Sequence, residues 1–130
     1  MAPETPTIPE DELDNSSAPL ENNNDLDSKI SDHFGESSFF AIVDIRVDEN
    51  TKSLEGYTII TNKYKDVEKR KGILISDWLV SMKIDKIYLK KELKTGPKLI
   101  FENSIVYTEI TSFEYLKQII SSEVETNSSP

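Results

Sequence analysis

The sequence predicts a small α/β domain in which helices cover the faces of one sheet. Stretches typical of strands alternate with stretches of helical periodicity, in the order β-β-α-β-α-β-α. The chain has 130 residues, the length of one domain, and its 36% of hydrophobic residues suffices for one modest core. Because helices separate the later strands, we expect the second half of the sheet to be parallel.

The first two strands are predicted to form a hairpin. Residues 39–47 (FFAIVDIRV) are β-branched and aromatic, which is typical of a strand buried on at least one face. Residues 48–51 (DENT) have the composition of a turn, and residues 53–61 (SLEGYTIIT) are typical of a second strand. An additional opening strand before residue 21 would complete the sheet.

The second half is predicted to alternate between helices and strands. Residues 72–82 repeat apolar side chains at helical spacing, which indicates an amphipathic helix. Residues 97–102 begin with a proline, which the first turn of a helix tolerates. Residues 112–121 form the last predicted helix, with Ser112 as a candidate N-cap. Short strands are expected at residues 84–89 and 105–107.

Charge and composition divide the chain into three parts. Residues 1–17 are rich in proline, acid and serine, and we expect a disordered acidic leader there. The domain is expected over residues 18–121 and a disordered polar tail over 122–130. The net charge is −9, but residues 1–28 hold eight of the 24 acids and no base, which leaves 16 acids against 15 bases. An acidic leader before a nearly neutral domain argues against nucleic acid as a partner.

Several kinds of protein are excluded by what the sequence lacks. Without cysteine there is no disulfide, thiolate metal site or cysteine nucleophile. No apolar run approaches the roughly 18 residues of a membrane helix, and the first 20 residues do not resemble a secretory signal. We therefore expect a cytoplasmic protein that does not insert into a membrane.

Three loops are expected to form a binding crevice. In open α/β sheets, ligands bind outside the carboxyl ends of the parallel strands. The loops at residues 21–34, 62–71 and 90–96 should meet there, and the last two lead into helices whose N-termini favour anions. Their many lysines would suit an anionic ligand, although for most of them an ordinary solvated face is the simpler explanation.

The candidates for catalysis and metal binding are few. His33 is the only histidine, so it could serve as a metal ligand, or it could simply position the turn before Gly35. The sequence contains no Gly-x-Ser-x-Gly elbow, no second histidine to act as a base and no glycine-rich phosphate loop. We therefore expect a protein that is not an enzyme and has no catalytic residue.

Residues 26–37 (LDSKISDHFGES) and 39–44 (FFAIVD) contain the step His33-Phe34-Gly35 shortly before an apolar strand. With these motifs the chain resembles the dinitrogenase iron–molybdenum cofactor biosynthesis family of nitrogenase accessory factors, and that step is the most recognisable feature of the family's opening. The resemblance covers about residues 18–120, and its second half is most similar to the version of the domain appended to some cation diffusion facilitator transporters. Further matching motifs follow in order: Glu68-Lys69-Arg70-Lys71-Gly72-Ile73, Asp77-Trp78-Leu79, Ile84-Asp85, Lys91-Glu92-Leu93 and Gly96-Pro97.

This resemblance implies a fold, a function and a site. The fold would be a three-layer α/β/α domain with a ribonuclease-H-like motif and a mixed five-stranded sheet. The function would be non-catalytic binding or carriage of an iron–molybdenum or iron–sulfur cluster or its precursor. The ligand-binding residues would be His33, Phe34, Gly35, Lys71, Gly72, Gly96 and Pro97.

The sequence departs from the family at two places. Residues 15–20 (NSSAPL) match the family's central first strand, but they make a poor strand because Pro19 lacks a donor. Residues 68–71 (EKRK) stand where many relatives carry histidines, which leaves an anionic small ligand or a regulatory role open. The alternative function is a regulatory or interaction domain that responds to divalent cations, a protein partner or a transporter. A magnesium-dependent nuclease ranks last, since the acids do not fall on obviously neighbouring strands.

Overall fold

The structure is a computed structural model that describes residues 13–49 and 51–124. One five-stranded sheet has the order β3-β2-β1-β4-β5. The strands are β1 (Leu13–Leu20), β2 (Phe39–Val47), β3 (Lys52–Thr61), β4 (Lys86–Leu89) and β5 (Tyr107–Ile110). The helices are α1 (Lys71–Ser81), α2 (Thr95–Asn103) and α3 (Leu116–Glu123), with a short 3-10 helix, η2 (Asp25–Asp27).

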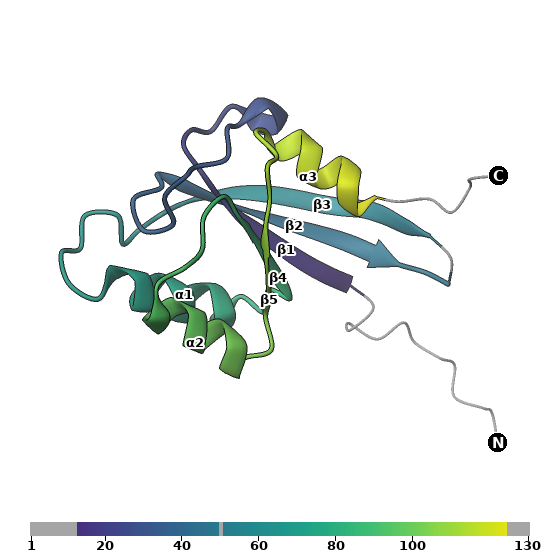
Figure 1. The fold of residues 1–130 in the computed structure, drawn as a ribbon. Coiled ribbons are helices and arrows are strands. Elements are labelled where there is room, and N and C mark those ends of the chain that lie inside the picture. The colour runs from purple at the N-terminus through teal and green to yellow at the C-terminus, as the bar shows by residue number, and fades with distance from the viewer. Residues whose placement is uncertain (1–12, 50, 125–130) are drawn as a thin grey trace, which may run out of the picture.

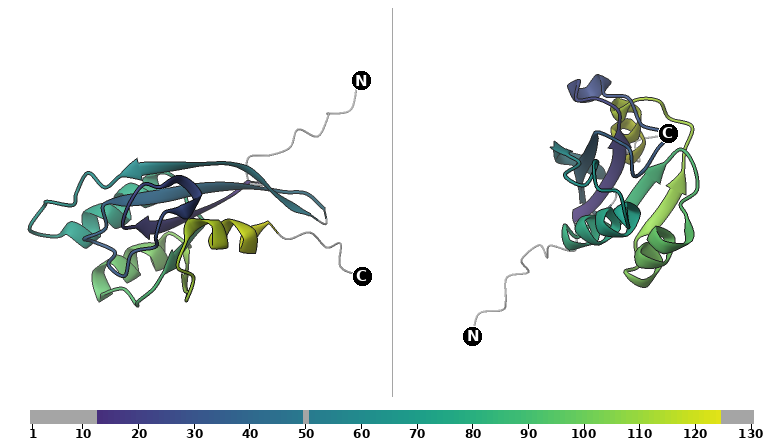
Figure 2. Two further views of the ribbon diagram at one scale, coloured as in Figure 1. Left: turned by 90° about the horizontal axis from the view of Figure 1, so that it is seen from above. Right: turned by 90° about the vertical axis from the view of Figure 1, so that its left-hand side faces the viewer.

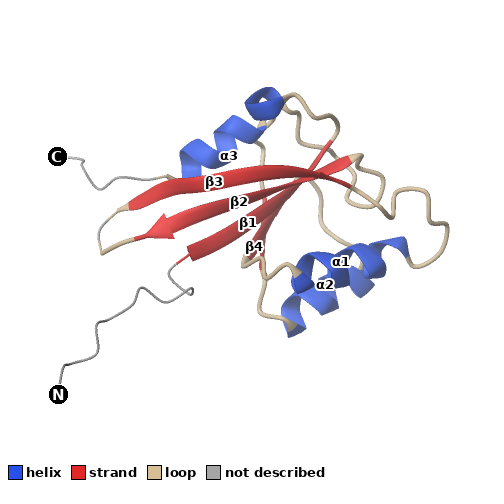
Figure 3. Cartoon of the chain, turned by 180° about the vertical axis from the view of Figure 1, so that it is seen from behind, coloured by secondary structure: helices blue, strands red, loops and turns tan. Residues whose placement is uncertain are grey.

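The elements form three layers. Helices α1 and α2 lie on one face of the sheet and α3 lies on the other (Figures 1, 2 and 3). Strands β1, β2 and β3 are antiparallel, whereas β1, β4 and β5 are parallel. Each face buries its own apolar cluster, one around Phe40, Leu79 and Phe101, the other around Tyr88 and Leu116. The predicted three-layer α/β/α fold with a mixed five-stranded sheet is therefore confirmed.

Strand β1 corrects the expected start of the domain. Residues 13–17 form the first part of this central strand, so the expected leader of residues 1–17 was too long. Small side chains suit this position, since Ser16, Ser17 and Ala18 are each only 1% exposed between two neighbouring strands. Pro19 is tolerated because the pairing with β4 ends at Ser17, before the missing donor. Residues 1–12 of the expected leader lie outside the described residues.

The last two elements begin later than expected. The strand predicted at 105–107 is β5, which starts at Tyr107 because the backbone turns at Ile105, a residue with φ of 58°. Val106 donates to the Phe101 carbonyl at 2.8 Å and closes that turn. Helix α3 starts at Leu116, and its N-cap is Tyr115, not Ser112. The tail expected at 122–130 was also wrong at its start, since α3 continues to Glu123, while residues 125–130 lie outside the described residues.

Within residues 13–49 and 51–124, no helix has the length and apolar character needed to cross a membrane.

Candidate functional site

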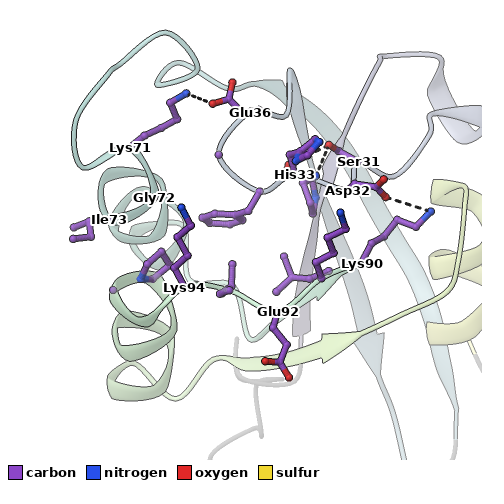
Figure 4. Close-up of a pocket in the computed structure, with 18 of the residues that line it drawn as sticks. Ser31, Asp32, His33, Glu36, Lys71, Gly72, Ile73, Lys90, Glu92 and Lys94 are labelled. Atoms are coloured by element: carbon purple, nitrogen blue, oxygen red, sulfur yellow. Dashed lines mark hydrogen bonds and ion pairs between the residues drawn. The ribbon is translucent and has the colours of Figure 1, made fainter.

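A pocket of about 680 Å³ lies at the carboxyl ends of β1 and β4, beside the starts of α1 and α2 (Figure 4). Its lining residues fall at 31–36, 68–73 and 89–97, in or directly beside the three loops predicted to meet, at residues 21–34, 62–71 and 90–96. The structure brings all seven residues of the predicted ligand site to this one pocket: His33, Phe34, Gly35, Lys71, Gly72, Gly96 and Pro97.

Hydrogen bonds of the Ser31 and Asn62 side chains hold the loop that carries His33. The Ser31 hydroxyl accepts from the His33 N–H at 3.0 Å and lies 3.1 Å from the His33 carbonyl, which fixes the turn. Asn62, at the end of β3, donates to the carbonyls of Gly35 at 3.2 Å and Ser37 at 2.9 Å. Its side-chain oxygen accepts from the Tyr64 N–H at 3.0 Å. Sequence analysis missed Asn62, because nothing in the local pattern distinguishes a buried asparagine from a loop asparagine.

Phe34 and His33 point to different environments. The Phe34 ring makes edge-to-face contacts with Phe40 and Phe101, at centroid distances of 5.7 and 6.0 Å, and so anchors the loop in the core. His33 is exposed at the pocket rim. In the described part of the chain, no three His, Asp or Glu side chains are grouped as a metal site. A metal-ligand role for His33 therefore stays a prediction.

Two helix N-termini open onto the pocket. Helix α1 has Arg70 as its N-cap, with a left-handed φ of 60°, and α2 has Lys94 as its N-cap. Neither cap side chain hydrogen-bonds to its helix. The first-turn N–H groups of a helix have no intrahelical partner, and the dipole makes this end positive. The pocket therefore offers backbone donors from two helices.

The two helix starts touch through glycines. A Cβ on Gly72 would come within 2.8 Å of Pro97 Cγ, and one on Gly96 would come within 3.2 Å of Ile73. Two side chains at these points would push α1 and α2 apart. The packing of the two helices is thus a sufficient reason for both glycines, whether or not they contact a ligand.

The charges around the pocket are partly paired. Lys71 pairs with Glu36 at 2.8 Å, and this hydrogen bond lowers the pKa of the Glu36 carboxyl. Lys90 lies 3.0 Å from Glu114 and 3.9 Å from Asp32. Among the lining residues with no ion-pair partner in the described chain, three are cations and two are acids. They are Arg70, Lys91, Lys94, Glu68 and Glu92.

The close-up shows how two of these side chains are directed. Lys94 runs toward the start of α1, beside Gly72, whereas the Glu92 carboxylate is turned away from His33 and Lys94 (Figure 4). The backbone donors of the two helix starts and the Lys94 ammonium therefore share this space.

Known proteins support the same fold. The family model of the dinitrogenase iron–molybdenum cofactor matches residues 18–91, more than half of the chain. The structure is similar to that of PH0822, with a TM-score of 0.66, 12% identity and coverage of 88% of this chain and 97% of the other. No curated protein matches the chain.

Two further solved structures are similar. The apo form of the orange protein from Desulfovibrio gigas gives a TM-score of 0.63 at 11% identity, covering 89% of this chain and 94% of that one. A NifB-like protein from Thermotoga gives a TM-score of 0.62 at 14% identity, covering 90% and 96%. At these identities the likeness shows the fold alone, and the similarity to the transporter-appended version stays a prediction. The family model decides the assignment: the chain belongs to the dinitrogenase iron–molybdenum cofactor family.

Proposed function

We propose that this domain is a non-catalytic carrier that holds a metal cluster, or a small anionic precursor of one, in the pocket at the carboxyl ends of β1 and β4. One observation carries the proposal: the His33 loop and the starts of α1 and α2 converge on a single pocket of about 680 Å³. That volume lies within the roughly 300–1,000 Å³ of small-ligand sites. Membership of the cofactor family supplies the class of ligand.

The donors around the pocket suit a metal–sulfur species. The charge of such clusters and the hydrogen bonds to their sulfurs are the means by which proteins hold and tune them. Here the first-turn N–H groups of α1 and α2, with Lys91 and Lys94, supply donors and positive charge. The chain has no cysteine, so His33 would add the one imidazole ligand among the pocket residues, beside the carboxylates of the lining. Such a site would hold its cargo by many weak contacts, as release to an acceptor requires.

The other functions receive less support. A two-metal nuclease needs clustered carboxylates, and the described residues hold no group of three potential metal ligands. The same observation gives no support to a site for simple divalent cations. Regulation through a protein partner or a transporter stays a prediction.

The proposal is tested by anaerobic titration of the protein with isolated iron–molybdenum cofactor, and separately with tetrathiomolybdate, a small molybdenum–sulfur dianion. We expect a protein-bound visible absorbance that co-elutes with the protein in gel filtration. Lys94→Glu should weaken binding by about tenfold, the effect of roughly 1.4 kcal/mol. Lys98→Glu is the matched control, because it makes the same charge change on the same helix outside the pocket lining.

Each outcome has a clear meaning. Binding that Lys94→Glu weakens and Lys98→Glu leaves nearly unchanged supports the pocket as the site. Binding that neither substitution alters places the ligand elsewhere. No bound chromophore with either species would refute the carrier function.

A further inference from the structure

The sheet has an open edge at β5. Tyr107 donates to the Asp85 carbonyl at 2.9 Å, and Thr111 donates to the Leu89 carbonyl at 2.7 Å, so both residues face β4. Alternate residues of a strand direct their backbone groups to opposite sides. The N–H and C=O groups of Thr108 and Ile110 therefore point away from β4, where the described chain places no further strand.

Large apolar side chains surround this edge. Of the seven exposed large hydrophobic residues in the described chain, five fall within residues 99–115. Helix α2 and strand β5 are neighbours at this side of the molecule (Figures 1 and 2). We define the β5 edge patch as Leu99, Ile105, Tyr107 and Ile110, which are 50%, 89%, 62% and 51% exposed.

The opposite edge of the same sheet is protected. Natural edge strands avoid pairing with other chains by means of charged side chains and bulges. Strand β3 carries exposed Lys52 and Glu55, and its register with β2 is irregular beside Asp44. Strand β5 has one charged side chain, Glu109, which is already paired with Lys86 at 3.0 Å. Only the β5 edge is thus both apolar and free of unpaired charge.

The exposed area of the β5 edge patch is large enough to form a substantial part of a dimer interface. An aromatic side chain contributes roughly 150–250 Å² when it is buried, and isoleucine or leucine contributes somewhat less. Four such side chains, half to nine-tenths exposed, offer a few hundred Å², which is a large share of the roughly 800 Å² that each partner gives to a standard interface. The backbone groups of β5 and its flanking turns would add the remainder.

We propose that β5 pairs antiparallel with β5 of a second copy of this chain, about a two-fold axis. A two-fold axis makes the interface isologous, so the free backbone groups of Thr108 and Ile110 in each copy would satisfy those of the other. Glu109 of one copy would lie opposite Glu109 of the other, and the ion pair of each carboxylate with Lys86 limits their repulsion. None of the four patch residues lines the pocket, so both pockets stay open in the dimer.

Sedimentation velocity over a concentration series tests this pairing. We expect the 14.8 kDa chain to sediment as a dimer as its concentration rises. Thr108→Pro removes one outward N–H without touching the pairing with β4, and Ile110→Lys adds a charge to the edge. Both variants should be monomeric, with the circular dichroism spectrum of the wild type. Leu54→Lys is the matched control, since it adds the same charge at the exposed Leu54 of β3, and it should remain dimeric.

Hydrogen exchange provides a second readout that needs no variant. The amide protons of Thr108 and Ile110 should exchange more slowly as the protein concentration rises. A wild-type protein that stays monomeric at millimolar concentration overturns the proposal. A dimer that persists in both edge variants, with fast exchange at Thr108 and Ile110, also overturns it, because the interface would then lie elsewhere.

Discussion

At the scale of single residues, Asn62 determines the shape of the pocket loop. Its side chain is 4% exposed and uses both of its polar atoms, as donor to the Gly35 and Ser37 carbonyls and as acceptor from the Tyr64 N–H. A buried polar group is stable only when it is paired, so the amide and the two carbonyls depend on one another. The loop that presents His33 therefore rests on a residue that does not line the pocket.

We predict that Asn62→Ala lowers the free energy of unfolding by about 1–3 kcal/mol, the cost of leaving buried carbonyls unsatisfied. Urea denaturation measures the loss. Asn103→Ala is the control, because Asn103 is exposed at the end of α2 and its replacement should change stability by less than about 0.5 kcal/mol. Equal effects of the two substitutions would show that Asn62 does not hold the loop.

The residues of the site were predictable to different degrees. His33, Phe34 and Gly35 form a recognisable local motif, so family resemblance was enough to select them. The contacts of Asn62 with Gly35 and Ser37 join residues 25 to 27 positions apart, and local sequence carries no sign of them. Gly72 and Gly96 were selected as ligand contacts, and the structure adds a reason in the packing of α1 on α2.

At the scale of elements, the close approach of α1 and α2 sets the spacing of the two helix N-termini. We predict that Gly72→Ala costs about 1–3 kcal/mol of stability, as overpacking does, because its Cβ would lie 2.8 Å from the rigid Pro97 ring. Gly96→Ala should cost less, since the contact at 3.2 Å is with the flexible side chain of Ile73. Thermal unfolding of both variants measures the difference.

Gly56 offers the control for these two substitutions. A Cβ at Gly56 meets nothing within 4 Å, so Gly56→Ala in β3 should be neutral or slightly stabilising. If Gly72→Ala proved as harmless as Gly56→Ala, the two helices would not be limited by contact at that point.

The other face of the sheet holds α3 through a polar group of three residues. The Tyr88 hydroxyl in β4 donates to Glu123 at the end of α3, and Lys86 lies 3.3 Å from the same carboxylate. Burial raises the pKa of Tyr88 to about 12, and the hydrogen bond to Glu123 contributes in the same direction. Burial alone would lower the pKa of Lys86, but hydrogen bonds to Tyr88 and Glu109 outweigh it and raise that pKa.

These shifts predict a loss of stability in alkali. The folded state binds the Tyr88 proton more tightly than the unfolded chain, whose tyrosine pKa is 10.0, so this stability is complete below 10.0 and is lost as pH rises through about 12. The raised pKa of Lys86 acts with the same sign. Unfolding free energies over this pH range should fall less steeply in Tyr88→Phe than in the wild type.

The predicted boundaries of strands and helices match the structure where the sequence pattern is long and local. The strand predicted at residues 39–47 matches β2, and the predicted helix at 72–82 differs from α1 by one residue at each end. Strand β1 was in doubt because its serines and Pro19 are poor strand residues. Strand β1 is buried because β2 and β4 flank it. This position depends on the whole sheet and cannot be read from the residues of β1 alone. The start of β5 was missed because a left-handed turn at Ile105, a β-branched residue, has no local signature.

At the scale of the whole molecule, charge is separated along β1. Residues 1–12 contain four acids and no base, whereas Arg70, Lys91 and Lys94 lie around the pocket. Strand β1 runs from Leu13 to the pocket residue Pro19, a distance of roughly 20 Å at about 3.3 Å per residue. The acids of residues 1–12 therefore join the domain at the end of β1 opposite the pocket.

This separation predicts a salt-dependent effect on binding of an anion. Replacing Glu4, Glu10 and Glu12 by Gln and Asp11 by Asn removes four negative charges, so the net charge changes from −9 to −5. Tetrathiomolybdate should then bind a few-fold more tightly at low ionic strength. The gain should disappear near physiological salt, because the Debye length there is about 8 Å and the attachment point at Leu13 lies beyond it. Titrations of both proteins over a salt series measure the effect. A gain that persists at high salt would instead indicate direct contact between residues 1–12 and the pocket, and no gain at low salt would contradict the long-range effect.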